Sequence, residues 1–272
     1  MILVVSSTED IASMNIAEKV IDHYGFTKAS QVFRGNPVYS KKLGEQEVRL
    51  VSVNEDITDT QAITNFFTPK LLVFISRHSS TSGKPTLSVH VPGNLTNEAT
   101  LGGIPGKVSV AAPCAMREAL TEMKRLNDTM QLDYEVSYEC THHGPSLDVA
   151  TMFTELGSSP EQWKDSKAAE VVAHATMAAV SRRSECRAVL GIGGPHYNKK
   201  FTKIALTTKT AFGHIIPKYA IAQVDVGMIR QCVRRTAEPV ESAILEWKGI
   251  RGADRGKLIA ALDRMGVPVE RI

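Results

Sequence analysis

Six of the eight histidines in this 272-residue chain lie in five short segments that are rich in serine, glycine or proline. The segments span residues 76–80, 89–94, 141–145, 193–197 and 213–219. Their histidines are His78, His90, His142, His143, His196 and His214. The ordinary pKa of imidazole, about 6.5, lets it accept or donate a proton near neutral pH. The pattern therefore predicts general acid–base chemistry.

These histidine segments share a position relative to the expected strands. Four of them end a predicted strand or directly follow one. In an open α/β sheet, ligands bind outside the carboxyl ends of the strands, so histidines at the ends of neighbouring parallel strands converge. Glycine and proline form tight turns that hold a side chain in place. We therefore expect a histidine-lined cleft, whereas His23 and His174, in helical stretches, are interpreted as structural.

A zinc ion is one candidate occupant of such a cleft, because histidine with a carboxylate is a common zinc-binding set. His142, His143 and Glu155 are the candidate ligands, and Glu139 lies nearby in the sequence. The chain has no HExxH motif and no HxxxH pair on a helix. Adjacent side chains on a regular strand also point to opposite faces. Spacing alone therefore leaves zinc binding open.

Two further motifs are less specific. The serine pairs at 79–80 and 158–159 lie outside a GxSxG elbow, so capping is favoured over a nucleophilic role. The run GIGG at 191–194 follows a predicted strand, and its backbone N–H groups could approach a phosphate. His196, Lys199 and Lys200 next to it would add charge-assisted hydrogen bonds. A simple turn is the alternative interpretation.

Basic residues are concentrated in residues 181–235, although the whole chain has a net charge of only +3. This segment holds eleven basic and two acidic residues, a net charge of +9, which leaves −6 for the rest of the chain. The basic residues are Arg182, Arg183, Arg187, Lys199, Lys200, Lys203, Lys209, Lys218, Arg230, Arg234 and Arg235. Such an asymmetry predicts a polyanionic partner. The alternative is a solvated basic face that binds nothing.

Cysteine usage and hydrophobicity bear on the compartment. Cys114, Cys140, Cys186 and Cys232 are far apart and form no CxxC pair, so reduced, buried thiols and a cytosolic location are expected. No apolar run approaches the roughly 20 residues that a membrane-spanning helix needs. The N-terminus lacks the basic region of a signal peptide, and its apolar run at residues 2–5 predicts a strand.

Hydrophobic periodicity predicts the elements that must position these side chains. Strands are expected at residues 2–5, 71–75, 87–91, 108–112, 134–139, 149–156, 187–192, 201–207 and 267–269, with a hairpin at 38–53. Helices are expected at 15–24, 113–128, 160–180, 228–235 and 255–265. No repeat or linker interrupts the chain, so a single α/β domain over residues 1–272, with helices covering a mixed sheet, is expected.

Five long phrases of the sequence resemble a known family. They are SRHSSTSGKPTLSVHVPGN (76–94), ECTHHGPS (139–146), FTELGSSPEQW (153–163), GIGGPHYNKKFT (191–202) and AFGHIIPKYA (211–220). In this order they resemble the archaeal and plant type of D-aminoacyl-tRNA deacylase, over nearly the whole chain. Cys140 departs from the pattern, because a small residue without a thiol is more usual there. The matching positions are His78, His90, His142, His143, Glu155, His196, His214 and Lys218.

The resemblance implies a monomeric enzyme that hydrolyses the ester between a D-amino acid and the terminal ribose of tRNA, and the cysteine usage predicts that it is cytoplasmic. It implies a three-layer α/β/α fold with a mixed sheet, of the phosphorylase/hydrolase type and similar to bacterial peptidyl-tRNA hydrolase. It also implies zinc dependence. Because an aminoacyl ester is already activated, positioning and modest acid–base help would suffice.

The expected roles follow from the motifs and the resemblance together. The candidate catalytic residues are His78, His142, His143, His196, His214 and Lys218. The candidate residues for binding substrate and tRNA are Arg77, His90, Gly193, Gly194, Lys199, Lys200, Lys203 and Tyr219. Lys218, or the backbone N–H groups of Gly193 and Gly194, could stabilise an oxyanion.

Two other functions stay open from the sequence. A zinc-dependent amidase or peptidase of related fold, acting on a small acyl-amino acid, would work without RNA and would lose all activity on chelation. A non-catalytic RNA-binding protein would bind tRNA without turnover. The histidine-rich cleft and the +9 segment occur together. An amidase does not need the basic segment, and a pure binding protein does not need the cleft.

Overall fold

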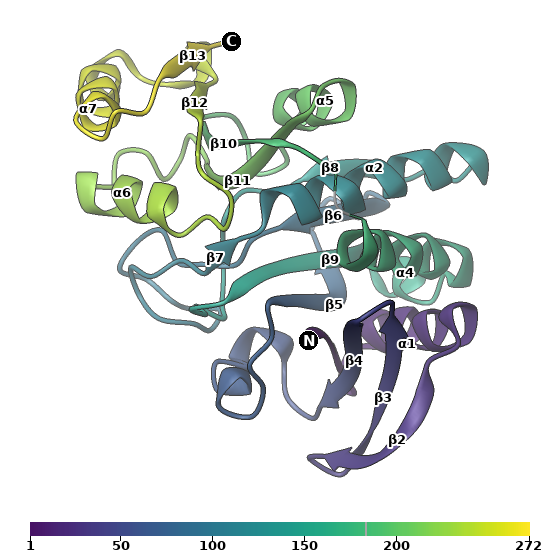
Figure 1. The fold of residues 1–272 in the computed structure, drawn as a ribbon. Helices are drawn as coiled ribbons and strands as arrows, with labels where there is room; N and C mark the ends of the chain where they lie inside the picture. Colours follow the sequence, from purple (N-terminus) through teal and green to yellow (C-terminus); the bar gives the residue numbers. More distant parts are fainter. Residues whose placement is uncertain (183) are drawn as a thin grey trace.

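The computed structural model describes residues 1–182 and 184–272, and these form two β-sheets flanked by helices (Figure 1). The larger sheet has nine strands, in the order β2-β3-β4-β1-β5-β9-β6-β8, with β7 paired to β9. The strands are β1 (Ile2–Ser7), β2 (Thr27–Phe33), β3 (Asn36–Leu43), β4 (Gln46–Val53), β5 (Leu71–Ser79), β6 (Thr86–His90), β7 (Val110–Ala111), β8 (Glu135–Tyr138) and β9 (Ala150–Ser158). β4, β1, β5 and β9 run parallel, whereas β6 is antiparallel to β9. The predicted α/β class with a mixed sheet is confirmed.

The smaller sheet was not expected from the sequence. It consists of four parallel strands in the order β11 (Thr210–Ile216), β10 (Arg187–Ile192), β12 (Ser242–Leu245) and β13 (Val269–Arg271). Val189 and Phe212 face one core cluster of this sheet, and Leu190 and Ile216 face another, so the sheet is buried on both sides. α2 (Pro113–Thr129) and α5 (Lys199–Thr207) cover the first side, and α6 (Val226–Arg234) and α7 (Gly252–Asp263) cover the second.

The two faces of the larger sheet are covered differently. α1 (Ile11–Tyr24), α4 (Ser166–Ser181) and α2 pack on one face around a core that includes Val73 and Met152. On the other face, Phe74 and Phe153 pack beneath the 3-10 helices Ile57–Asp59 and Ile63–Asn65. No helix among the described residues is long and apolar enough to cross a membrane.

Most predicted elements are present, but some expectations were wrong. Residues 201–207 form most of α5 rather than a strand, because the Asn198 side chain caps the helix by accepting a hydrogen bond from the N–H of Phe201. The helix expected at 160–180 is two helices, α3 (Pro160–Trp163) and α4, because Asp165 caps α4 anew. β2, β11 and β12 were not predicted.

Two cysteines form a disulfide, which corrects the expectation of four reduced thiols. Cys114 in the first turn of α2 is bonded to Cys186, directly before β10, across a sequence separation of 72 residues. Cys140 and Cys232 are free and buried, as expected. Spacing could not reveal the pair, because only the packing of α2 beside the smaller sheet brings these positions together.

Reduction of the Cys114–Cys186 bond is expected to lower the free energy of unfolding by about 2–4 kcal/mol, since the cross-link restricts the unfolded chain. Urea unfolding with and without dithiothreitol measures this change. A Cys114→Ser variant should have the same urea midpoint as the reduced wild type, and dithiothreitol should not change that midpoint. Equal midpoints for fully oxidised and fully reduced wild type would contradict the prediction.

Candidate active site

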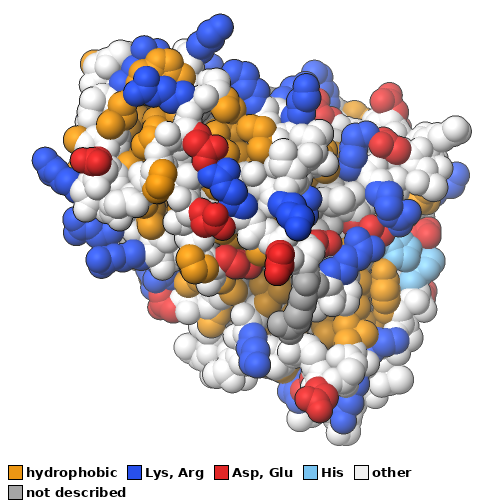
Figure 2. Space-filling model, turned by 45° about the horizontal axis from the view of Figure 1, so that its top comes forward, with side chains coloured by type: hydrophobic (Ala, Val, Ile, Leu, Met, Phe, Trp, Pro, Cys, Tyr) orange, Lys and Arg blue, Asp and Glu red, His pale blue; other side chains and the backbone are white. Residues whose placement is uncertain are grey.

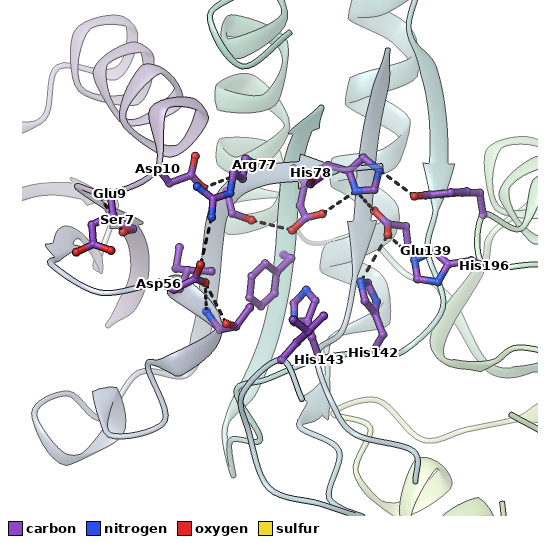
Figure 3. Close-up of a pocket in the computed structure, with 18 residues that line it drawn as sticks. Ser7, Glu9, Asp10, Asp56, Arg77, His78, Glu139, His142, His143 and His196 are labelled. Carbon is purple, nitrogen blue, oxygen red and sulfur yellow. Dashed lines mark hydrogen bonds and ion pairs between the residues drawn. The ribbon is translucent and has the colours of Figure 1, made fainter. Parts of the chain in front are cut away.

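A cavity of about 540 Å³ lies on the face of the larger sheet opposite α1, α2 and α4 (Figure 3). Ser76 and His78 of β5 project into it beside Phe153 and Glu155 of β9, because alternate residues of a strand share a face. Glu139, His142 and His143, after β8, and His196 and Tyr197, after β10, form a second wall. The remaining lining residues are Ser7, Glu9, Asp10, Asp56, Ile57, Thr58, Arg77, Ser79 and Leu101.

The position of this cavity differs from the expected rim of parallel strands. The carboxyl end of β5 contributes His78, as predicted. β6 and β8, however, run antiparallel to β9, so their carboxyl ends return toward the middle of β9, where His90 pairs with Phe153. The histidines therefore meet over the face of the sheet. β5 and β8 run in opposite directions, and their carboxyl ends approach each other there.

His78 lies between two buried carboxylates. Its Nδ1 atom is 3.3 Å from Oε1 of Glu139 and 3.5 Å from Oε2 of Glu155, and its Nε2 atom is 2.9 Å from the hydroxyl of Tyr197. Trp163 donates its indole N–H to the backbone carbonyl of His78 over 2.8 Å, which holds this end of β5. Burial alone would lower the pKa of His78, but the two carboxylates raise it above its ordinary value.

The two carboxylates have pKa values that are shifted in opposite directions. Burial raises the pKa of Glu155 to about 7, although it accepts a hydrogen bond from Ser76 over 2.8 Å. Burial would also raise the pKa of Glu139, but His78 and a hydrogen bond from His196 lower it well below its usual range. Near neutral pH, Glu139 is therefore ionised, whereas Glu155 is present in both its protonated and its ionised form. Such divergence within one site is the arrangement that acid–base enzymes use.

His196 and Glu139 form an ion pair, and the thiol of Cys140 contacts the other ring nitrogen of His196. Nε2 of His196 is 2.8 Å from Oε2 of Glu139, and its Nδ1 is 3.2 Å from Sγ of Cys140 and 3.1 Å from the hydroxyl of Tyr219. Burial disfavours the charged ring, but Cys140 and Glu139 together raise the pKa of His196 to about 10. Cys140 is fully buried and does not line the cavity, so its thiol positions His196.

Three neutral imidazoles form the adjoining wall. His142 donates its Nδ1–H to the carbonyl of Cys140 over 2.9 Å, and His143 donates its Nδ1–H to the carbonyl of Gly144 over 2.6 Å. His90 packs behind them, edge to face with His143, and its Nε2 atom is 3.1 Å from that of His143. Burial lowers the pKa of all three rings, so each is unprotonated near neutral pH.

The adjacent residues His142 and His143 reach the same cavity because the backbone leaves the strand conformation. His143 has a φ of 42°, in the left-handed region that residues other than glycine seldom adopt. Its ring therefore turns toward His142, with the ring centroids 4.3 Å apart. The expectation that neighbouring side chains diverge, which holds for a regular strand, does not apply at this turn.

The structure brings six of the fifteen predicted site residues into one cavity. His78, His142, His143, His196, Arg77 and Glu155 line the cavity. His90 supports its wall and Tyr219 contacts His196. The predicted zinc ligands His142, His143 and Glu155 do not form one group. Glu155 lies with His78 and Glu139, whereas His142 and His143 lie with His90.

Several predicted residues lie elsewhere, which corrects their proposed roles. His214 is buried outside the cavity, between the hydroxyl of Thr141 at 3.2 Å and the carbonyl of Arg235 at 3.0 Å. The side chain of Lys218 is exposed and does not line the cavity. The Gly193–Gly194 turn does not line it either, and the carboxylate of Glu246 packs against Gly194, where it would repel an anion.

Sequence reasoning missed or undervalued several residues of the site. Glu139 was noted only as a neighbour, although it joins His78, His142 and His196. Tyr197 was not assigned a role, yet its hydroxyl bonds to His78. Both adjoin predicted histidines in the phrases ECTHH and GGPHY, which is the signal that could have found them.

The chain matches proteins of one family along most of its length. Residues 65–270 match the family model described as D-aminoacyl-tRNA deacylase. This chain belongs to the D-aminoacyl-tRNA deacylase family. It is 40% identical over 260 residues to the D-aminoacyl-tRNA deacylase of Pyrococcus furiosus, covering 93% of each chain. It is 34% identical to the deacylase of Methanosarcina acetivorans, covering 98% of this chain and 91% of that one.

The fold comparison agrees with this family assignment. A crystal structure of a conserved protein of unknown function has 30% sequence identity to this chain and a TM-score of 0.90, with 100% of this chain and 95% of that one covered. The resemblance inferred from the sequence is therefore confirmed.

The basic segment of this deacylase-family chain is partly neutralised in the fold. Arg183 lies outside the described residues. Five of the other ten basic residues form ion pairs with acids from outside the segment: Arg182 with Glu122, Arg187 with Glu270, Lys199 with Glu135, Lys200 with Glu246, and Arg235 with Asp148. Figure 2 shows basic and acidic side chains intermingled on one face. The sequence excess of +9 therefore overstates the local positive charge.

Proposed function

We propose that this chain hydrolyses the ester between a D-amino acid and the terminal ribose of tRNA, and so releases free D-amino acid and tRNA. The observation that carries the proposal is the pair of buried carboxylates, Glu139 and Glu155, whose pKa values diverge around His78 in one cavity. A group with a pKa near the working pH is the best general base for water. The curated relatives named D-aminoacyl-tRNA deacylase support the choice of substrate.

Glu155 is the general base in this proposal. Its carboxylate takes a proton from a water molecule, whose oxygen forms a bond to the carbonyl carbon of the ester. The tetrahedral intermediate then collapses, the bond from carbon to the ribose oxygen breaks, and the proton passes from Glu155 to that oxygen. The hydrogen bond from Ser76 holds Oε1 of Glu155, while Oε2 lies 3.5 Å from Nδ1 of His78.

The negative charge that develops on the carbonyl oxygen needs a donor within the cavity. Tyr197 fits this role, because burial raises the pKa of its hydroxyl to about 12 and keeps the proton in place. The Nε2 atom of His78 orients that hydroxyl from 2.9 Å. Arg77 supplies a guanidinium at the mouth of the cavity, where Asp56 holds it at 3.2 Å. Preorganised donors of this kind stabilise the transition state.

Zinc is a further part of the proposal, with His90, His142 and His143 as its ligands. Their donor atoms lie within 4.8 Å of one another, and burial keeps the rings in the unprotonated form that binds metal. Backbone carbonyls accept the Nδ1–H groups of His142 and His143, which directs both Nε2 atoms away from the backbone. When bound there, zinc would act as a Lewis acid toward the ester carbonyl.

The deciding assay compares matched D-tyrosyl-tRNA and L-tyrosyl-tRNA with the purified protein. We expect hydrolysis of the D form and negligible hydrolysis of the L form. Equal rates on both forms, or no turnover on either, would overturn the proposal. Cleavage of an N-acyl amino acid without RNA would instead support the amidase function, and tRNA binding without turnover would support the non-catalytic one.

The acceptor end of tRNA is proposed to contact α5, which begins two residues after Tyr197. Lys203 on this helix is exposed, and no ion pair is found for it among the described residues. We expect KM to rise with salt, and Lys203→Gln to reduce the slope of log KM against log salt by about one. Lys200→Gln is the matched control with a smaller effect, because Glu246 already pairs with Lys200 at 3.0 Å. Equal slopes for wild type and Lys203→Gln would exclude this contact.

A further inference from the structure

A second group of metal-ligating side chains lies on the helical layer, away from the cavity. Glu170 and His174 are one turn apart on α4, and His23 is in the last turn of α1, which packs against α4. The cavity adjoins the opposite end of α1, where Asp10 caps the helix. A helix rises about 1.5 Å per residue, so the length of α1 separates the two places by about 20 Å.

The three side chains converge on one point. One donor atom from each of His23, Glu170 and His174 lies within 4.8 Å of the other two. Nε2 of His174 is 3.7 Å from Oε1 of Glu170, and the rings of His23 and His174 meet edge to face with centroids 5.4 Å apart. The side chains of His174 and Glu170 are 27% and 32% exposed, so the sequence interpretation of His174 as a packed helix residue is incomplete.

A separate contact orients His174 for ligation. The hydroxyl of Tyr24 is 2.6 Å from Nδ1 of His174, which leaves Nε2 facing Glu170. Metal-binding histidines commonly make such a bond through the nitrogen that does not bind the metal, which fixes the orientation of the ring. Tyr24 adjoins His23 in the sequence, so the end of α1 supplies both a ligand and a support.

We propose that His23, Glu170 and His174 bind a divalent transition-metal ion, with Zn²⁺ as the favoured ion. Two imidazoles and a carboxylate suit zinc, with water completing the tetrahedron. The ion would join α1 to α4, which are more than 140 residues apart in the sequence. Because only the folded chain holds these donors together, binding stabilises the fold. The proposal does not depend on the proposed deacylase activity.

The test measures Zn²⁺ binding by calorimetry, and the unfolding temperature, on metal-stripped full-length protein. We expect His23→Gln and His174→Gln each to bind one equivalent fewer than wild type, with hydrolysis of D-aminoacyl-tRNA unchanged. Tyr24→Phe should weaken the same equivalent by about 10–100-fold, as for loss of a supporting contact. Glu18→Gln removes an exposed carboxylate of α1 outside the group and is the matched control.

The outcomes separate this site from the cavity. His23 is exposed, so His23→Gln removes a ligand without disturbing the core. We expect Zn²⁺ to raise the unfolding temperature of wild type and Glu18→Gln more than that of His23→Gln. Equal zinc stoichiometry and equal thermal shifts in wild type, His23→Gln and His174→Gln would overturn the proposal. Loss of an equivalent only in His142 or His143 variants would overturn it too.

Discussion

Replacing Glu155 by Gln is expected to lower kcat for D-aminoacyl-tRNA by about 10²–10⁴-fold, the contribution of a positioned general base. The amide has nearly the same shape and can still accept the hydrogen bond from Ser76, but it cannot take a proton from water. KM should change little, because Glu155 lies deep in the cavity and acts on water rather than on the tRNA. Steady-state rates on D-tyrosyl-tRNA measure the effect.

The pH profile separates this role from a structural one. Ser76, His78 and Glu139 face the carboxyl group of Glu155, whose pKa burial raises to about 7. The base acts when ionised, so kcat/KM of wild type should rise as pH increases through about 7. This rise of kcat/KM with pH should be absent in Glu155→Gln. Glu45→Gln, in the exposed β3–β4 turn, is the control that keeps it. Full activity of Glu155→Gln at pH 7 would remove Glu155 from the mechanism.

Replacing His142 or His143 by Ala is expected to lower turnover by about 10²-fold or more, as for a lost acid–base group. Both rings line the cavity as neutral imidazoles whose Nδ1–H groups are held by backbone carbonyls. Each substitution removes one ring that can orient water or hold the proposed zinc. Rates on D-tyrosyl-tRNA and zinc content should be measured together with thermal unfolding.

His214→Gln provides the comparison for these variants. His214 is more deeply buried than His142 and His143, and it bonds Thr141 and Arg235 outside the cavity. We expect it to lower the unfolding temperature and to leave kcat of the folded protein close to that of wild type. If His142→Ala and His143→Ala keep wild-type turnover while folded, neither ring takes part in the reaction.

The elements with strong local signals were predicted well. The turn at Gly44 and the apolar arm that follows it predicted the β3–β4 hairpin. Pro113 predicted the start of α2, and the expected end at residue 128 is one residue before the observed end at Thr129. The errors occurred where local patterns are ambiguous. The KKFTKIALT segment fits both a strand and an amphipathic helix, and the side chain of Asn198 decides for the helix. Burial of β11 on both sides left no alternation to detect.

The sequence by itself determined the chemical inventory: which residues can move protons, that they follow strands and turns, and which family the phrases resemble. Tertiary structure decided which of them act together. It placed Glu139 against His78 and His196, turned His143 toward His142, excluded His214 and Lys218, and paired half of the described basic residues of segment 181–235 with distant acids. The physical reason is that pKa and net charge depend on burial and on neighbours in space, and strand direction and packing set those neighbours.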